Sequence, residues 1–160
     1  QLINDIYNAN MPIFGVCFGH QLIAQALGGR VEKSIKGWGL GLHTYEINNK
    51  ADYMGNLSEE VTLNICHQDQ VLEVPEGATI YARSQFCENA GFYIKDKVLT
   101  MQAHPEFLVD FIKALLNARR DVTIPKEFVD PALVKLNSYP DTVQSNQFAE
   151  TIRKFFQVRF

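Results

Sequence analysis

The chain has 160 residues, with 15 Lys and Arg residues against 18 Asp and Glu residues, so its formal net charge is −3. Apolar residues make up 46% and charged residues 21%, a composition typical of one globular domain and unlike that of a disordered chain. The charge balance argues against a nucleic-acid-binding module, and no apolar run approaches the roughly 20 residues of a membrane span. Three cysteines without a Cys-x-x-Cys pair argue against a disulfide framework or a zinc site, and they favour a reducing, cytoplasmic setting.

The N-terminal part of the chain predicts helix, strand and helix in that order. Residues 1–10 have the pattern of the end of a helix, and because the chain opens on Gln1 we expect residues upstream of it. The apolar run 12–16 is typical of a strand buried on both faces of a parallel sheet. A helix is expected over 18–27, where Gly28 can adopt the left-handed conformation that ends it.

The remainder of the chain predicts short strands followed by helices. The expected strands are 42–47, 61–65, 79–82, 91–94 and 98–102. Helical spacing after Pro105 predicts a helix that ends near Arg119 and Arg120, and a last helix is expected over 145–156. The segment 124–140 is expected to be irregular. The predicted fold class is α/β in a single domain, residues 1–160, with a parallel sheet, helices on its faces and a few antiparallel strands.

A potential nucleophile lies where the first predicted strand meets the following helix, in the run Gly15-Val16-Cys17-Phe18-Gly19. Strand-to-helix elbows of this kind need small residues two positions either side of the nucleophile, because the turn is strained. The start of a helix favours a thiolate and offers the backbone N–H of Phe18 to an oxyanion. Cys17 is therefore a candidate nucleophile, and the alternative is a buried core cysteine beside a strand.

His104 is the candidate acid/base, because it follows the predicted strand 98–102 and so falls at the carboxyl edge of the sheet that presents Cys17. Pro105 stiffens the backbone before Glu106, whose carboxylate can then orient the imidazole. The order Cys, His, Glu has the logic of a catalytic triad. The alternative is a plain helix start with a glutamate in its first turn.

Two blocks of sequence resemble a known family. Gly-Val-Cys-Phe-Gly-His-Gln at 15–21 and Ala-His-Pro-Glu-Phe at 103–107 resemble the class I (triad) glutamine amidotransferases. Lys-Gly-Trp-Gly-Leu-Gly at 36–41 and Cys-His-Gln-Asp-Gln-Val at 66–71 are similar to the stand-alone members labelled GMP-synthase-like. The resemblance covers most of 12–119. It implies a flavodoxin-like fold with a parallel sheet.

The resemblance also implies roles for individual residues. Cys17 would be the nucleophile, His104 the acid/base and Glu106 its orienter. The residues implied to hold the amino-acid end of glutamine are Gln21, His67, Gln68 and Asp69. The GMP synthase pattern has glycine at the position of Gln68, and the His-Gln-Asp-Gln form also resembles the plant-type γ-glutamyl peptidases. Family members begin with strand–helix units that supply a second oxyanion donor, so we expect the domain to be N-terminally incomplete.

The leading functional expectation is a glutaminase or amidotransferase that cleaves the γ-carboxamide of glutamine through a Cys17 thioester and releases ammonia. We expect a small-molecule substrate, no cofactor, no metal, no nucleic acid and no membrane, and an ammonia-accepting synthase in trans is a candidate partner. His20 beside Cys17 is not expected to bind a metal, because no second Cys/His pair has matching spacing. The first alternative is a γ-glutamyl peptidase with the same chemistry. The second, from another class, is a catalytically silent regulatory or binding domain.

Overall fold

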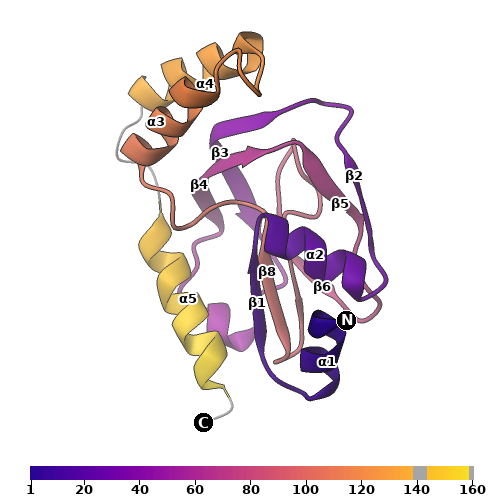
Figure 1. Ribbon diagram of the computed structural model, residues 1–160. Helices are drawn as coiled ribbons and strands as arrows, with labels where there is room; N and C mark the ends of the chain where they lie inside the picture. Colours follow the sequence, from indigo (N-terminus) through magenta and orange to yellow (C-terminus); the bar gives the residue numbers. More distant parts are fainter. Residues whose placement is uncertain (139–143, 159–160) are drawn as a thin grey trace.

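The computed structural model describes residues 1–138 and 144–158 as an α/β fold, which is the predicted class (Figure 1). The helices are α1 (Leu2–Asn8), α2 (Phe18–Ala26), α3 (Val109–Arg119), α4 (Lys126–Ser138) and α5 (Ser145–Gln157), with a short 3-10 turn η1 (Asp52–Met54). The strands are β1 (Ile13–Val16), β2 (Arg30–Lys33), β3 (Gly39–Ile47), β4 (Glu60–His67), β5 (Asp69–Glu73), β6 (Thr79–Arg83), β7 (Gly91–Ile94) and β8 (Val98–Met101).

The main sheet has six strands in the order β1-β8-β7-β6-β3-β4. Its β1–β8 pair is parallel, with Gly15 opposite Thr100, and the other four pairs are antiparallel. Antiparallel pairing is therefore more extensive than the sequence predicted. The reason is that β6, β7 and β8 form a meander with a tight turn at 95–97, and β3 and β4 form a long hairpin.

The parallel β1–β8 pair fixes the position of β1, and through it that of α2, at one edge of the main sheet. β1 pairs only with β8 among the described strands, and within it Gly15 alone is fully buried. The prediction of a strand buried on both faces is thus wrong for these residues, because an edge position leaves Phe14 and Val16 half-buried. The strand–helix junction itself is confirmed, since α2 starts at Phe18 and ends before Gly28, which has a φ of +95°.

The six-stranded sheet is covered on both faces. Val98 belongs to the hydrophobic cluster that contains Ile23 of α2, and the next residue, Leu99, belongs to the cluster that contains Phe148 of α5. Because successive side chains of a strand point to opposite faces, α2 and α5 lie on opposite sides of the sheet, as Figure 1 also shows. A third cluster packs α3 and α4 against Leu40 of β3.

The prediction of an irregular segment at 124–140 is wrong for residues 126–138, which form α4, while 139 and 140 lie outside the described residues. Pro131 inside the helix removes one N–H donor and lowers the helical signal of the sequence. Packing outweighs this cost: Val129, Ala132 and Leu136 follow helical spacing and are buried against β3 and α3. Tertiary contacts therefore decide the conformation here.

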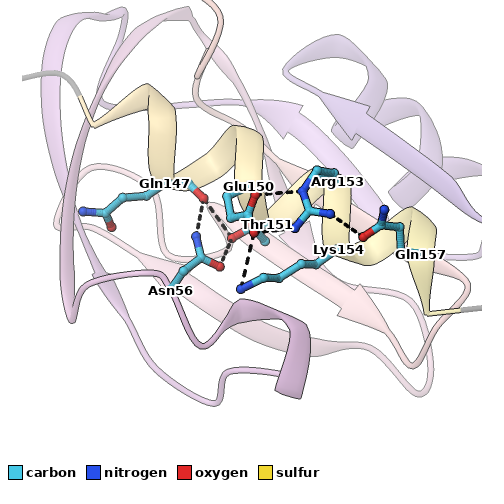
Figure 2. A network of polar contacts seen from close by, with 7 residues as sticks. All are labelled: Asn56, Gln147, Glu150, Thr151, Arg153, Lys154 and Gln157. Carbon is cyan, nitrogen blue, oxygen red and sulfur yellow. Dashed lines mark hydrogen bonds and ion pairs between the residues drawn. The ribbon is translucent and has the colours of Figure 1, made fainter.

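The last predicted helix is confirmed as α5. Phe148 and Phe155 are buried, whereas Phe156 is 39% exposed. Polar contacts fix the helix to the segment after η1: the Asn56 amide donates to the backbone oxygen of Gln147 at 2.6 Å, and the Thr151 hydroxyl donates to Asn56 Oδ1 at 3.2 Å (Figure 2).

Helix length and polarity bear on membrane insertion. None of the helices in the described part of the chain is long and apolar enough to cross a membrane.

Candidate active site

Cys17 lies at the elbow between β1 and α2, with φ 48° and ψ −102°. Positive φ is uncommon for a residue with a Cβ, and at functional sites it stores strain that the surrounding structure must hold. The backbone N–H of Cys17 donates to the oxygen of Met101 at 2.8 Å, which ties the elbow to the end of β8. The strained turn predicted for the candidate nucleophile is therefore present.

The two glycines that flank the elbow differ in what they allow. A Cβ at Gly15 would lie 2.5 Å from Ile23 Cδ1 and 2.8 Å from the backbone oxygen of Gly19. A Cβ at Gly19 would meet no heavy atom within 4 Å. The expected steric need for a small residue holds at position 15 and is wrong at position 19, because it is the backbone of Gly19 that approaches Gly15.

Phe18 begins α2, so its backbone N–H is one of the helix's first four donors, which have no acceptor inside the helix. Phe18 itself is 68% exposed. The oxyanion contact, in which the N–H of the residue after the nucleophile binds the developing negative charge, stays a prediction.

His104 follows β8 and is held in place by β4. Its backbone N–H donates to the oxygen of Asn64 at 2.9 Å, and the Asn64 amide donates to the backbone oxygen of Phe107 at 3.0 Å. The Phe107 ring stacks on the imidazole, with centroids 3.8 Å apart and planes inclined by 5°. The backbone turn and the ring are therefore both fixed.

The imidazole contacts both other members of the predicted triad. His104 Nδ1 lies 2.7 Å from Glu106 Oε1. Burial acts to lower the pKa of His104, but hydrogen bonds to the Cys17 sulfur and the Glu106 carboxylate outweigh it and raise this pKa to about 9. Burial likewise acts to raise the pKa of Glu106, but the hydrogen bond from His104, a backbone hydrogen bond and the His104 charge together outweigh it and lower that pKa. The structure thus brings Cys17, His104 and Glu106 together.

The residues expected to hold glutamine meet at the start of β5. Gln21 donates through Nε2 to the backbone oxygen of Asp69 at 2.8 Å, and His67 Nδ1 lies 3.0 Å from the same oxygen. Because a carbonyl only accepts, His67 carries its proton on Nδ1, and its buried Nε2 has no partner among the described residues. Burial lowers the pKa of His67 to about 4, so the ring is neutral at pH 7.

A cavity of about 410 Å³ opens on the Cys17 thiol. The predicted residues that line it are Cys17, Gln21, His67, Gln68 and Asp69. Trp38 also lines it, and three further residues line it without having been predicted near the site: Lys33, Cys66 and Arg119. A second cavity of about 280 Å³, which lies between β5 and the loop before β3, contains none of the triad.

Gln102 is a further residue of the candidate site that the sequence did not predict. It is fully buried, its Nε2 lies 3.5 Å from Cys17 Sγ, and its Oε1 accepts a hydrogen bond from Gln21 Nε2 at 3.1 Å. Its place two residues before His104 was the available signal, because alternate residues of an extended segment share a face.

His20 is buried beside Phe92. Its Nδ1 lies 2.8 Å from the Thr100 hydroxyl, and burial lowers its pKa to about 3. Among residues 1–138 and 144–158, no group of three or more His, Cys, Asp or Glu side chains is arranged to hold a metal ion.

The model of the family described as glutamine amidotransferase class-I matches residues 1–113. Gamma-glutamyl peptidase 3 of Arabidopsis thaliana is 37% identical over 130 residues, which cover 75% of this chain and 51% of that protein. The glutamine-hydrolyzing GMP synthase of Finegoldia magna is 36% identical over 107 residues, which cover 66% of this chain and 21% of that protein. The chain spans about half the length of the Arabidopsis relative.

The crystal structure of a glutamine amidotransferase from Thermotoga maritima has the same fold, with a TM-score of 0.81 at 22% identity, over 98% of this chain and 67% of that one. This match confirms the predicted fold. The family model matches more than half of the chain, which shows that the chain belongs to the class I glutamine amidotransferase family.

Proposed function

We propose that the chain carries the amidase site of a glutamine amidotransferase, in which Cys17 is the nucleophile, His104 the acid/base and Glu106 the residue that orients it. The observation that carries this proposal is the pairing of His104 with Glu106 at 2.7 Å beside a strained Cys17 elbow that opens on a cavity. A hydrogen bond to the Cys17 sulfur is among the causes that raise the pKa of His104. Such an arrangement suits acyl transfer through a thioester.

The reaction follows from the positions of these groups. The Cys17 sulfur attacks the γ-carbonyl carbon of glutamine, and the carbonyl oxygen becomes an oxyanion that accepts a hydrogen bond from the Phe18 N–H. The C–N bond then breaks, and the His104 imidazolium gives its proton to the departing ammonia. Water, with His104 as base, cleaves the thioester to glutamate and returns the proton to the imidazole.

Gln21, His67, Gln68 and Asp69 are proposed to hold the amino-acid end of the substrate, since they line one side of the cavity and Gln21 and His67 converge on the Asp69 carbonyl. Ammonia would pass to a synthase in trans, a proposal supported by the identity with a glutamine-hydrolyzing GMP synthase.

A γ-glutamyl peptidase is the second candidate function, and the identity with Gamma-glutamyl peptidase 3 favours it. The nucleophile would attack the same γ-carbonyl, and His104 would protonate the amine of an amino acid or peptide instead of ammonia. The cavity supports this reading, because its volume of about 410 Å³ lies in the range of about 300–1,000 Å³ that is usual for small-molecule sites.

The test is hydrolysis of glutamine and of γ-glutamyl dipeptides by the full-length gene product, with labelling of Cys17 by a thiol-reactive glutamine analogue. We expect both substrates to be cleaved, with glutamine the better one. Cys17→Ala should abolish labelling and lower kcat by several orders of magnitude while the fold persists. Cys87→Ala, which removes a core thiol, should keep the label. A folded wild-type protein that is neither labelled nor active would favour a silent binding domain.

A further inference from the structure

Gln102 is a buried amide whose two polar atoms are both engaged inside the candidate site. Its side chain is 0% exposed, and it lies between the nucleophile and the segment proposed to hold the substrate. A buried amide is retained at a cost unless its hydrogen bonds are made, and those of Gln102 go to Cys17 and Gln21 rather than to the core.

The hydrogen bonds that link Asp69, Gln21, Gln102 and Cys17 can each be given a direction, because one of the atoms involved can only accept. The Asp69 backbone carbonyl can only accept, so Gln21 presents Nε2 to it at 2.8 Å. The same Nε2 lies 3.1 Å from Gln102, which must therefore present its oxygen. Only the Nε2 donor of Gln102 is then left to face Cys17 Sγ at 3.5 Å.

We propose that Gln102 is a second hydrogen-bond donor to the Cys17 thiolate, alongside the His104 imidazolium, and that Gln21 acts as a positioning residue by fixing the orientation of the Gln102 amide. The inference rests on the function proposed above and assigns Gln102 a role in the proposed amidase site. A hydrogen bond to the charged form of an acid stabilises that form, and a donor that stays in place needs no reorganisation when the thiolate forms.

The contact is specific to the elbow. Cys17 has a positive φ and its N–H donates to the Met101 oxygen, and Gln102 directly follows Met101 in the chain. The Gln102 backbone N–H donates to the oxygen of Ala90 at 2.7 Å, so the main chain that carries the amide is tied to the neighbouring segment. The thiol and its donor are thus fixed by the same end of the sheet.

The experiment compares Gln102→Met with wild type in the full-length gene product. Methionine keeps nearly the same length and removes both polar atoms, while Gln21 retains its hydrogen bond to Asp69. The first readout is the rate of Cys17 alkylation at pH 7 by chloroacetamide, a small neutral reagent that needs no glutamyl recognition. We expect alkylation to slow about tenfold, the scale of a lost hydrogen bond to a charged group.

The second readout separates this role from a structural one. We expect kcat for glutamine to fall about tenfold with KM within about twofold of wild type. Gln147→Met is the matched control. Gln147 lies on α5, and its amide also both donates and accepts, but its partner is Ser58, away from the candidate site. It should leave alkylation and kcat unchanged. Gln102→Asn, which keeps an amide but withdraws the donor by one methylene, replaces Gln102→Met if that variant does not fold, and should show the same slowing.

Alkylation within twofold of wild type in a folded Gln102 variant would overturn the proposal. The outcome is independent of the proposed function, because alkylation requires no turnover. If wild type cleaves neither glutamine nor a γ-glutamyl peptide, the proposed function fails while the alkylation ratio still decides whether Gln102 acts on the thiol.

Discussion

Asn64 on β4 and His104 after β8 are paired through the backbone, with the His104 N–H donating to the Asn64 oxygen at 2.9 Å. The Asn64 side chain completes the link by donating to the Phe107 oxygen at 3.0 Å, and the Phe107 ring stacks on the imidazole. The acid/base of the candidate site is therefore oriented from a strand 40 residues earlier in the chain as well as by Glu106.

Asn64→Leu is expected to lower kcat about tenfold and the free energy of unfolding by about 1–3 kcal/mol, because the Phe107 carbonyl loses its donor and the His104 turn loosens. Denaturant unfolding and steady-state kinetics measure the two effects. Asn56→Leu is the matched control: its amide also donates to a backbone carbonyl, that of Gln147, but on the α5 side of the sheet. It should cost stability and leave kcat unchanged. Equal kcat in the two variants would show that Asn64 does not orient the imidazole.

His104 and Glu106 are expected to contribute unequally. His104→Ala should approach the loss of Cys17→Ala, because it removes the proton donor for the leaving group. Glu106→Gln should retain more activity, because it weakens only the contact at 2.7 Å that orients the ring. Kinetics of both single variants and the double variant test this. Since groups that act as a unit are not additive, losses that multiply fully in the double variant would contradict a shared role.

Stability is expected to fall as the pH rises toward 9. The pKa of His104 is about 9 in the folded chain, above its ordinary value of 6.5. A raised pKa means that the contribution of His104 is fully present below pH 6.5 and is lost as the pH passes through about 9. Denaturant unfolding across this window measures the slope. In Glu106→Gln the decline should still begin near pH 6.5 but should be smaller and end at lower pH, since one of the hydrogen bonds that raise the folded-state pKa is weakened. If the free energy of unfolding fell equally steeply with pH in His104→Ala, the pH dependence would come from other titratable groups.

Gly15→Ala and Gly19→Ala are expected to differ sharply although both glycines belong to the elbow. A methyl group at position 15 would overlap Ile23 and the Gly19 backbone at under 3.0 Å, so the variant should unfold at much lower denaturant concentration. A methyl group at position 19 meets open space at the start of α2, where alanine is the better helix former. Circular dichroism during urea unfolding compares them. Similar midpoints would show that β1 and α2 can move apart.

Arg119 is expected to favour substrates with a carboxylate on the leaving group. It lines the cavity, and it forms no ion pair within the described ranges, whereas the adjacent Arg120 pairs with Asp130 at 2.6 Å. Arg119→Met should raise the KM for γ-glutamylglycine severalfold, the scale of an exposed charge contact, and spare γ-glutamylglycinamide, which lacks the charge. Arg120→Met is the control and should change neither. An equal rise in KM for both substrates would show that Arg119 supports the structure and does not bind the carboxylate of the leaving group.

The sequence predicted those parts of the site that local structure determines. The β1–α2 elbow and the turn from β8 to His104 each lie within a few residues, so spacing and glycine placement were sufficient. The β2–β5 pair was missed because Lys33 and Asp69 lie 36 positions apart and neither strand has a clear apolar alternation. The helix α4 was missed because the helical spacing of its apolar residues was outweighed by Pro131. Gln102 escaped notice because its role depends on contacts with Cys17 and Gln21, both more than 80 residues away.

The positive φ of Cys17 bears on how this protein could be engineered. Every residue with a Cβ is strained at that position, and glycine alone is relaxed there. A library selected only for heat resistance would therefore be enriched in glycine at position 17, and its most robust members would be inert. Selection of improved variants therefore has to require catalytic activity as well as thermal stability, because glycine at position 17 favours stability whereas cysteine there is proposed to be needed for activity.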